Sequence, residues 1–358
     1  MSTLRKKILQ AWAGKSGDRT FLSILSGISF FYSAGVSIRN FFYDTGIFKV
    51  RRLGCPVISI GNITAGGTGK TPTAIMVAGL LQQHGFKPAV LSRGYGGTRK
   101  GINVVSDGRS ILSNPEEAGD EPFLIARTLA NVPVVTNPDR FAAGALALAT
   151  LGIDIIVLDD GFQHRPLYRD INIALLDSER PFGNGCLIPR GSLRERPAAL
   201  ARADLIILTR ADPAAGGESE QRLKGAFPGK ALMRARHEAV CVVQVGSGDT
   251  HPLSLIAGKR IAAFCGIAQP GSFRELILKA GGNIVFFKEY EDHQQYGPAD
   301  VNYLKQQAGR VSAQVIITTE KDSIKLEKMD FTELFALRIA VKVENPEFPE
   351  WLLTRLSK

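Results

Sequence analysis

Short apolar runs recur along most of the chain and are separated by segments with the spacing of amphipathic helices. The runs are rich in Val, Ile and Leu with little polar alternation, which is typical of parallel strands buried on both faces. Strands that alternate with helices predict two doubly wound layers, and no repeat with a period of roughly 20 to 50 residues indicates a solenoid. We predict strands at 57–61, 87–92, 103–106, 132–136, 153–160, 171–177, 205–209, 231–236, 240–245, 260–264, 283–287, 314–318 and 337–343. We predict helices at 72–81, 123–130, 140–151, 272–279, 299–308 and 351–356.

One apolar stretch differs from these short runs. Residues 21–38 carry no charge, are rich in Phe, Leu and Ile, and have basic residues on both sides. Their length is close to a bilayer span, but Ser and Gly make them less apolar than a typical transmembrane helix. We therefore predict a membrane-surface helix or hairpin, whose basic flanks meet anionic headgroups. A buried helix packed on the rest of the chain is the alternative, and a secretory signal is disfavoured because the apolar run starts late.

The length of 358 residues favours two domains over one. The net charge is +10, and most of this excess lies in residues 1–52, where nine Lys and Arg face two Asp. Because the basic residues flank an apolar stretch and are not interleaved with aromatics along a groove, they indicate a bilayer surface and not a nucleic acid. Four cysteines without a CxxC spacing indicate a reduced compartment and small buried side chains. We predict a membrane-associated helical segment at 1–52 and two α/β domains at 53–215 and 216–358, with the connection beginning at 211–217.

A glycine-rich loop follows the strand predicted at 57–61 and opens the next helix. Its glycines allow backbone N–H groups to point inward, and the helix adds unpaired N–H groups and a positive dipole end, which together suit phosphate binding. Lys70 can reach the β- and γ-phosphates, and Thr71 can supply a hydroxyl to Mg²⁺. Thr64 replaces the first glycine of the GxxxxGK[ST] motif, and an ordinary strand-to-helix turn is the alternative. The predicted nucleotide-binding residues are Thr64, Ala65, Gly66, Gly67, Thr68, Gly69, Lys70 and Thr71.

A second polar element ends the strand predicted at 153–160. Asp159 and Asp160 are adjacent carboxylates, which repel each other unless a cation is near. Mg²⁺ prefers such hard oxygen ligands, although Asp at a strand end also caps turns. The loops at 93–97 and 189–197 are further site candidates, because the first follows a strand end and the second is basic. A solvated loop is the alternative for each.

A series of short motifs runs through most of the chain. They are GNITAGGTGKTP (61–72), SRGYGG (92–97), AGDEP (118–122), LDDGFQH (158–164), LIPRGSLRE (187–195), CGIAQP (265–270), DHQQY (292–296) and TTEKD (318–322). Together, and in this order, they resemble the motifs of the tetraacyldisaccharide 4′-kinase family of lipid A biosynthesis. LDDGFQH and the phosphate loop with threonine in place of glycine are the most specific. One departure is the continuation of the Asp-His motif as Gln-Gln-Tyr, which bears only on substrate contacts.

The resemblance implies an α/β fold, in which a doubly wound P-loop NTPase domain is joined to a smaller α/β domain. It implies a peripheral or monotopic enzyme of the inner membrane with its active site facing the cytoplasm. Such an enzyme uses ATP and Mg²⁺ to phosphorylate the 4′-hydroxyl of an acylated glucosamine disaccharide 1-phosphate, giving lipid IVA. The lipid substrate and the membrane surface are the implied partners. Neither nucleic acid nor an obligate protein partner is expected.

The resemblance also implies roles for individual residues. Asp120 would be the catalytic base, assisted by His293, with Lys70 on the phosphates. A carboxylate is useful there because a sugar hydroxyl is too weak an acid to ionise at neutral pH. By a looser comparison with GTPases, the stretch at 318–322 would contact the nucleotide base. The residues implied to bind Mg²⁺ are Thr71, Asp159 and Asp160, and those implied to bind substrate are Tyr95, Arg194 and Glu195.

Two other functions fit parts of the pattern. A membrane-recruited ATPase switch has a similar phosphate loop, but its signature lysine would fall at Ala65. A soluble small-molecule kinase or amide-forming ligase could use the same fold. Its substrate would not require the basic and apolar N-terminus, so both alternatives explain less of the chain than a lipid kinase does.

Overall fold

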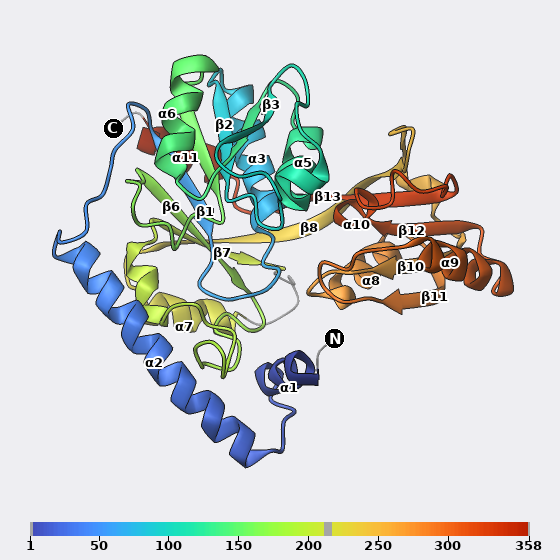
Figure 1. The fold of residues 1–358 in the computed structure, drawn as a ribbon, viewed down its shortest axis with the longest axis horizontal. Coiled ribbons are helices and arrows are strands. Elements are labelled where there is room, and N and C mark those ends of the chain that lie inside the picture. The colour runs from blue at the N-terminus through green and yellow to red at the C-terminus, as the bar shows by residue number, and fades with distance from the viewer. Residues whose placement is uncertain (1–2, 211–216, 357–358) are drawn as a thin grey trace.

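The computed structural model describes residues 3–210 and 217–356 (Figure 1). Thirteen strands form one sheet, in the order β11-β10-β12-β13-β8-β7-β6-β1-β5-β2-β4-β3, with β9 paired to β8. The connection predicted at 211–217 lies outside the described residues except for Gly217. The strands are β1 (Val57–Gly61), β2 (Pro88–Ser92), β3 (Asn103–Asp107), β4 (Pro133–Thr136), β5 (Ile155–Asp159), β6 (Ile171–Asp177), β7 (Leu205–Thr209), β8 (Ala231–Gln244), β9 (Thr250–His251), β10 (Arg260–Cys265), β11 (Asn283–Glu289), β12 (Val315–Thr319) and β13 (Leu334–Val343).

Each helix that the sequence pattern predicts is present, and α1, α4, α7 and α10 are additional helices that the pattern did not indicate. The α-helices are α1 (Thr3–Trp12), α2 (Arg19–Asp44), α3 (Lys70–Gln83), α4 (Pro115–Ala118), α5 (Asp120–Thr128), α6 (Arg140–Thr150), α7 (Glu218–Ala226), α8 (Pro270–Lys279), α9 (Pro298–Arg310), α10 (Glu320–Ser323) and α11 (Phe348–Leu356). Two 3₁₀ turns are η1 (Pro197–Arg202) and η2 (Leu253–Leu255).

The first half of the sheet, which consists of β1 to β7, is doubly wound, as predicted. β1 lies between β5 and β6 and pairs in parallel with both. Alternate residues of β1 point to opposite faces, so that Ile58 and Ile60 pack with α3 and α5 while Val57 packs with α6. Apolar partners on both faces explain the unbroken hydrophobic runs in the sequence. The carboxyl ends of β1, β2 and β5 lie at one edge of the sheet, where the polar loops begin.

β8 joins the two halves of the sheet. The sequence pattern predicted separate strands at 231–236 and 240–245, because polar residues at 236–238 interrupt the apolar run, but the structure has one strand. Its first residues pair in parallel with β7, and the remainder pairs antiparallel with β13. The two expected parallel layers are therefore one continuous mixed sheet (Figure 1).

The end of the chain returns to the first half. Phe348 and Leu352 of α11 are buried in the same core cluster as Ile58. A separate cluster around Phe264 and Phe331 forms the interior of the second half. The division into domains at 53–215 and 216–358 stays a prediction. The sheet continues across this boundary, and α11, which belongs to the second segment, packs in the core of the first.

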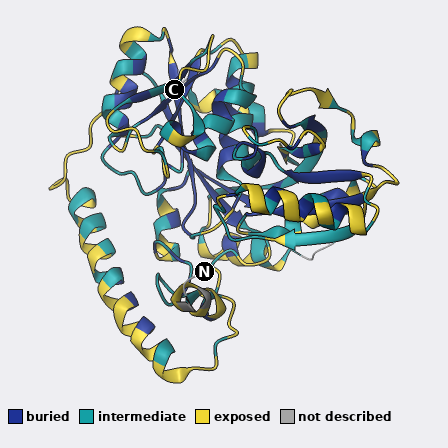
Figure 2. Cartoon of the chain, turned by 45° about the vertical axis from the view of Figure 1, so that its right-hand side comes forward, coloured by how far each residue is buried: buried dark blue, intermediate teal, exposed yellow. Residues whose placement is uncertain are grey.

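α2 is one 26-residue helix along the outside of the molecule and not a hairpin (Figure 1). The alternative of a buried core helix is wrong, because Phe30 and Phe31 are 69% and 76% exposed and most of the helix faces outward (Figure 2). A narrow stripe formed by Leu25, Ser29 and Ser33 faces the protein. In the described part of the chain, α2 is the single helix long and apolar enough, by length and composition, to cross a membrane.

Candidate active site

The phosphate loop lies between β1 and α3. Gly69, at the N-cap of α3, has a φ of 80°, a left-handed conformation that favours glycine. The Ala65 N–H donates to the carbonyl of Ser192 at 2.6 Å, and Asn62 Nδ2 donates to Thr68 Oγ1 at 2.8 Å. These contacts fix a turn in front of a helix N-terminus, which is an arrangement that binds phosphate.

The remaining residues of the loop divide into buried and exposed positions. Thr64, which replaces the first motif glycine, is buried and forms a β-bridge with Leu193. Gly66 and Gly67 are exposed at the crest of the loop. The side chain at position 64 therefore anchors the loop to the 187–195 motif, while the crest leaves its backbone open to a ligand.

Lys70 and Thr71 face the carboxylate pair that follows β5. Thr71 Oγ1 lies 3.3 Å from Asp159 Oδ2, and Lys70 Nζ lies 3.9 Å from Asp160 Oδ1. Arg194 Nη1 lies 3.0 Å from both carboxylate oxygens of Asp160. Residues predicted to bind phosphate, metal and substrate are thus brought together at one edge of the sheet.

The two carboxylates have opposite electrostatic surroundings. Burial, together with the charges of Glu121 and Asp160, raises the pKa of Asp159 above its usual range. Burial also opposes ionisation of Asp160, but Lys70 and Arg194 outweigh it and lower the pKa of Asp160. Asp159 therefore lies in an excess of negative charge that a bound cation would relieve.

The oxygen atoms around Asp159 are suitable ligands for Mg²⁺ if phosphate oxygens and water complete the coordination shell. Within residues 3–210 and 217–356, no group of three His, Cys, Asp or Glu side chains is arranged to hold a metal by itself. Thr71 and Asp159 offer a hydroxyl and a carboxylate side by side. Asp160 is paired with Lys70 and Arg194, so a direct bond to the metal requires it to exchange one of these partners.

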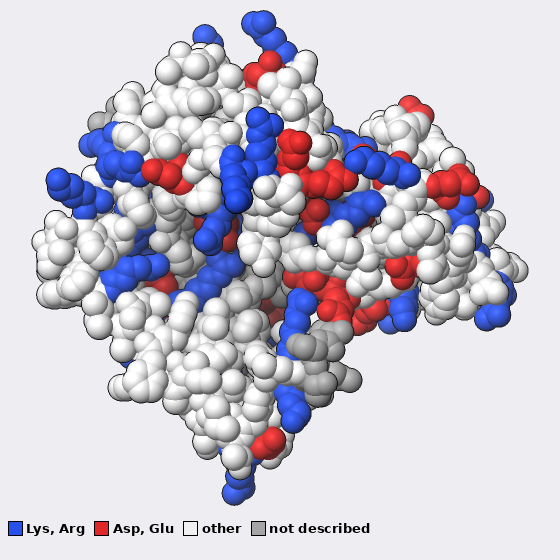
Figure 3. Space-filling model, viewed as in Figure 1, with Lys and Arg blue, Asp and Glu red and all other residues white. Residues whose placement is uncertain are grey.

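A second polar group lies at the junction of the two halves. Asp120 begins α5, and His293 follows β11; His293 Nδ1 lies 3.7 Å from Asp120 Oδ2. Lys325 Nζ lies 3.1 Å from the same Asp120 oxygen. Acidic and basic side chains are intermixed along this boundary on the molecular surface (Figure 3). The fold thus brings together an Asp and a His that are remote in the sequence, as the family resemblance implied.

A cavity of about 410 Å³ opens beside this pair. Tyr95 and Gly96 line it from the loop after β2, and Arg5 lines it from α1. The Tyr95 ring is 70% exposed and meets the His293 ring edge-on, with 5.8 Å between the centroids. An exposed aromatic ring among charged groups suits a ligand that has both polar and apolar faces.

Asp120 is well placed in this cavity to accept a proton. Burial opposes its ionisation, but His293 and Lys325 outweigh burial and hold the pKa of Asp120 below its usual range. The carboxylate is therefore ionised at neutral pH. It can take a proton from a hydroxyl whose acidity rises as a new bond to its oxygen forms.

Arg194 and Glu195 have different environments despite being neighbours. Arg194 is partly exposed, whereas Glu195 is only 1% exposed. Glu195 accepts hydrogen bonds from Asn40 Nδ2 at 2.7 Å and from Arg202 Nη2 at 2.9 Å to each oxygen. The predicted contact of Glu195 with substrate has no support in this arrangement, because protein donors already use both of its oxygens.

Several residues that the sequence reasoning did not single out also belong to the site. Asn62 holds the phosphate loop through Thr68, and the charge of Glu121 acts on Asp159. Lys325 contacts Asp120, and Lys321 contacts the neighbouring Glu121. Asn62, Glu121 and Lys321 lie inside the quoted motifs, so a signal was present. The motifs do not reveal which side chains meet.

The stretch at 318–322 takes part in the junction. Asp322 is fully buried and accepts from the Gly266 N–H at 2.9 Å and from Thr319 Oγ1 at 2.7 Å. Lys321 lies against Glu121 of α5. The GTPase-like contact with a nucleotide base has no support here, because the aspartate that would make it fixes a turn instead.

Comparison with known proteins identifies close relatives of the chain. The family model described as tetraacyldisaccharide-1-P 4′-kinase matches residues 21–357. The tetraacyldisaccharide 4′-kinase of Syntrophus aciditrophicus is 45% identical over 99% of this chain and 99% of its own length, and that of Pelobacter propionicus is 43% identical over 86% and 84%. A crystal structure of LpxK from Aquifex aeolicus in complex with ATP matches with a TM-score of 0.76 at 33% identity, covering 94% of this chain and 99% of the other.

Proposed function

The chain belongs to the tetraacyldisaccharide-1-P 4′-kinase family, and on that premise we infer that it phosphorylates a lipid A precursor. ATP would donate its γ-phosphate to the 4′-hydroxyl of a tetraacylated glucosamine disaccharide 1-phosphate, giving lipid IVA. The observation that carries this assignment to individual residues is the meeting of Lys70 and Thr71 with Asp160 and Asp159 at one sheet edge. The roles proposed below follow from that geometry.

The nucleotide phosphates would lie on the backbone N–H groups of residues 64–71, with Lys70 beside the γ-phosphate. Thr71 and Asp159 would hold Mg²⁺, which supplies charge neutralisation to the phosphate oxygens when bound. Asp160 would support the metal and keep Lys70 directed at the same place. Phosphoryl transfer requires positioning and positive charge, and this part of the site offers both.

Asp120 would act as the base for the acceptor hydroxyl, with His293 beside it. As the 4′-oxygen bonds to the γ-phosphorus and the bond to ADP breaks, the hydroxyl proton passes to the Asp120 carboxylate. Tyr95 lines the cavity in which the disaccharide would lie, and Arg194 offers a charge to the anionic ligand. Glu195 would hold α2 in place through Asn40 without touching the substrate.

The membrane surface would be contacted by α2. Its exposed apolar side chains face away from the protein, and the basic N-terminal segment complements anionic headgroups. We place the enzyme at the inner membrane with its site toward the cytoplasm, where ATP is available. Ser29 and Tyr32 of α2 donate hydrogen bonds to the carbonyls of Leu187 and Arg194, so the lipid-facing helix is attached to the motif that supports the site.

A transfer assay with purified components tests this function. The full-length protein in detergent is incubated with Mg²⁺, ATP carrying a radiolabelled γ-phosphate, and the purified disaccharide 1-phosphate lipid. We expect the label in a bis-phosphorylated lipid that migrates more slowly on thin-layer chromatography. Release of label only as inorganic phosphate, with none in lipid, contradicts the proposed function and favours an ATPase switch.

A further inference from the structure

Lys321 and Lys325 reach the Asp120–His293 pair from the segment 320–325, which contains α10. Lys325 is only 5% exposed, and its Nζ lies 3.1 Å from Asp120 Oδ2 and 3.0 Å from the carbonyl of Gln294. Burying an ammonium costs solvation free energy unless the charge is paired, so the buried Lys325 depends on its pairing with Asp120. It is not a surface charge that meets the carboxylate by chance.

Lys321 contacts the other member of the pair. Its Nζ lies 3.2 Å from Glu121 Oε1, 3.7 Å from Asp292 Oδ1 and 3.2 Å from His293 Nε2. The carboxylates of Glu121 and Asp292 outweigh burial and raise the pKa of Lys321, so it is an ammonium with three N–H donors and no acceptor. His293 Nε2 must therefore be the acceptor. In the neutral ring the proton is then on Nδ1, the atom that faces Asp120.

We propose that Lys321 and Lys325 are positioning residues for the Asp120–His293 pair, Lys321 by fixing the ring tautomer of His293 and Lys325 by keeping the Asp120 carboxylate ionised beside it. This inference rests on the proposed function, since it takes Asp120 to be the base. It adds a specific role for the 318–322 motif and for Lys325 beyond that motif. Neither lysine needs to touch the substrate for this role.

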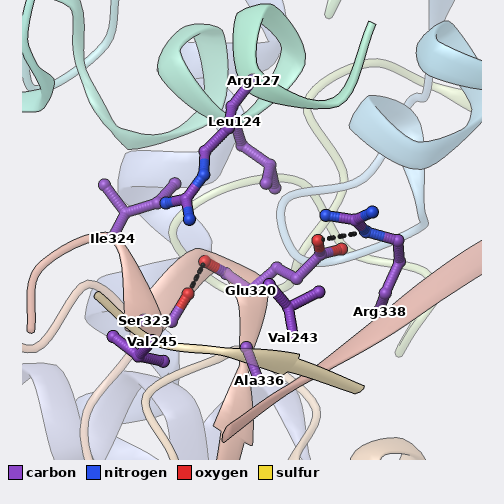
Figure 4. Close-up of a pocket in the computed structure, with 9 residues that line it drawn as sticks. All are labelled: Leu124, Arg127, Val243, Val245, Glu320, Ser323, Ile324, Ala336 and Arg338. Carbon is purple, nitrogen blue, oxygen red and sulfur yellow. Dashed lines mark hydrogen bonds and ion pairs between the residues drawn. The ribbon is translucent and has the colours of Figure 1, made fainter. Parts of the chain in front are cut away.

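The segment that carries both lysines is fastened to α5, which carries Asp120. Arg127 of α5 pairs with Glu327, and Glu116 of α4 pairs with Lys328 at 2.8 Å. On the other side, Glu320 accepts from Arg338 of β13 at 2.7 Å, and Figure 4 shows Arg127 reaching from α5 toward this cluster. The lysines are therefore held at Asp120 only while the two halves are packed together.

Charged and titratable groups face Asp120 from several elements, including Arg5 of α1 and Tyr95 of the loop after β2, which line the same cavity. Glu121 lies next to it on α5, and Asp292 and His293 approach from the segment after β11. Lys321 and Lys325 approach from α10 and the turn that follows it. Among these, the nearest cation is Lys325, so its removal is expected to have the largest effect on the protonation of Asp120.

A pH profile tests the role of Lys325. Without it the Asp120 pKa rises, so the acid limb of kcat for Lys325→Met is expected to move up by about 1 pH unit, with the KM for ATP unchanged. Lys325→Arg should restore the wild-type profile. Lys279→Met is the matched control, because it removes an exposed lysine of α8 that pairs with Glu275 and does not contact the segment 320–328. Profiles of Lys325→Met and Lys279→Met that coincide would overturn the proposal.

Nuclear magnetic resonance tests the role of Lys321 without using activity. The chain has five histidines, so long-range ¹H–¹⁵N spectra of protein labelled at histidine are simple, and a His293→Asn spectrum assigns the ring. We expect the Nδ1–H tautomer in the wild type and its loss or mixing in Lys321→Met. An Nε2–H tautomer in the wild type would overturn the proposal. Because this readout does not depend on lipid phosphorylation, failure of the kinase assay and failure of this inference can be told apart.

Discussion

The phosphate-loop part of the site and the part at the junction are built in different ways. The stretch 57–73 supplies a strand, a loop, a helix start and a cation within one continuous segment, and Asp159 with Asp160 follow the neighbouring strand. At the junction, Asp120 comes from α5, His293 from the segment after β11, and Lys325 from the segment after β12. The first part depends on neighbouring strands, and the second depends on the packing of two halves.

This difference separates two kinds of failure. A change in the phosphate-loop part removes charge or coordination that the nucleotide needs, so binding and chemistry should suffer together. A change at the junction leaves the phosphate loop in place, so ATP should still bind while the chemical step slows. The predictions below test whether the two parts are separable in this way.

The largest effect is expected for Lys70→Ala. Its ammonium is the cation nearest to Asp160 within the phosphate loop, and loss of charge stabilisation on a transferred phosphoryl group costs on the order of 10³-fold in turnover. The transfer assay should show no measurable lipid product. Lys259→Ala, an exposed lysine in the second half, is the control and should keep wild-type turnover. A Lys70→Ala enzyme that retains a large share of its activity would remove the lysine from the mechanism.

Asp120→Ala should slow the chemical step while leaving ATP in place. Loss of a positioned base is expected to lower kcat by about 10²-fold, because the hydroxyl proton then has no acceptor near it. Equilibrium binding of ATP, measured by calorimetry, should stay close to that of the wild type. If ATP binding falls and kcat does not, the two parts of the site are not separable and the base is another group.

Asp160→Asn should alter the response to Mg²⁺. Removing one of two adjacent carboxylates weakens the attraction for the metal, and the Mg²⁺ concentration for half-maximal activity should rise by about 10-fold or more. Activity measured across a Mg²⁺ titration checks this, with Asp249→Asn in an exposed loop as the control. A titration curve that matches the wild type would mean that Asp160 serves only to pair Arg194 and Lys70.

The smallest effect on catalysis is expected on α2. Phe31 is 76% exposed, and moving such a ring out of a bilayer costs about 1.5–3 kcal/mol, so Phe31→Ser should weaken binding to anionic vesicles by roughly 10-fold or more. Activity in detergent should not change. Leu278→Ser, on the exposed face of α8, is the control for a general loss of apolar surface. High salt should release the wild type only in part, and complete release by salt alone would rule out apolar insertion.

The same contrast explains which predictions from the sequence succeeded. Strands buried on both faces leave unbroken apolar runs, and a phosphate loop requires glycines, lysine and threonine at fixed spacing, so β1, α3 and β5 were predicted close to their observed bounds. β8 was predicted as two strands, because its polar middle at 236–238 breaks the pattern that identifies a strand. Its pairing with both β7 and β13 is what makes it continuous.

Side-chain partners across the fold were beyond the reach of the pattern. The family resemblance implied that Glu195 binds substrate, yet Asn40 and Arg202 occupy its oxygens in the interior. Lys321 looked like part of a nucleotide-base motif, yet it contacts Glu121 and His293. A motif indicates that a residue belongs to a functional region, and the residues that contact it in the fold indicate its role.

The sequence by itself determined the α/β alternation, the phosphate loop, the strand-end carboxylates and the apolar N-terminal segment, because each depends on residues close together in the chain. The tertiary structure alone decided that two halves share one sheet, that α11 returns to the first core, and that two lysines meet the Asp120–His293 pair. Contacts between residues that are far apart in the sequence depend on how whole helices and strands pack, and the local hydrophobic periodicity does not specify that packing. The physical reason is that backbone geometry is set within a few residues, whereas charge pairing is set by the final packing of the chain.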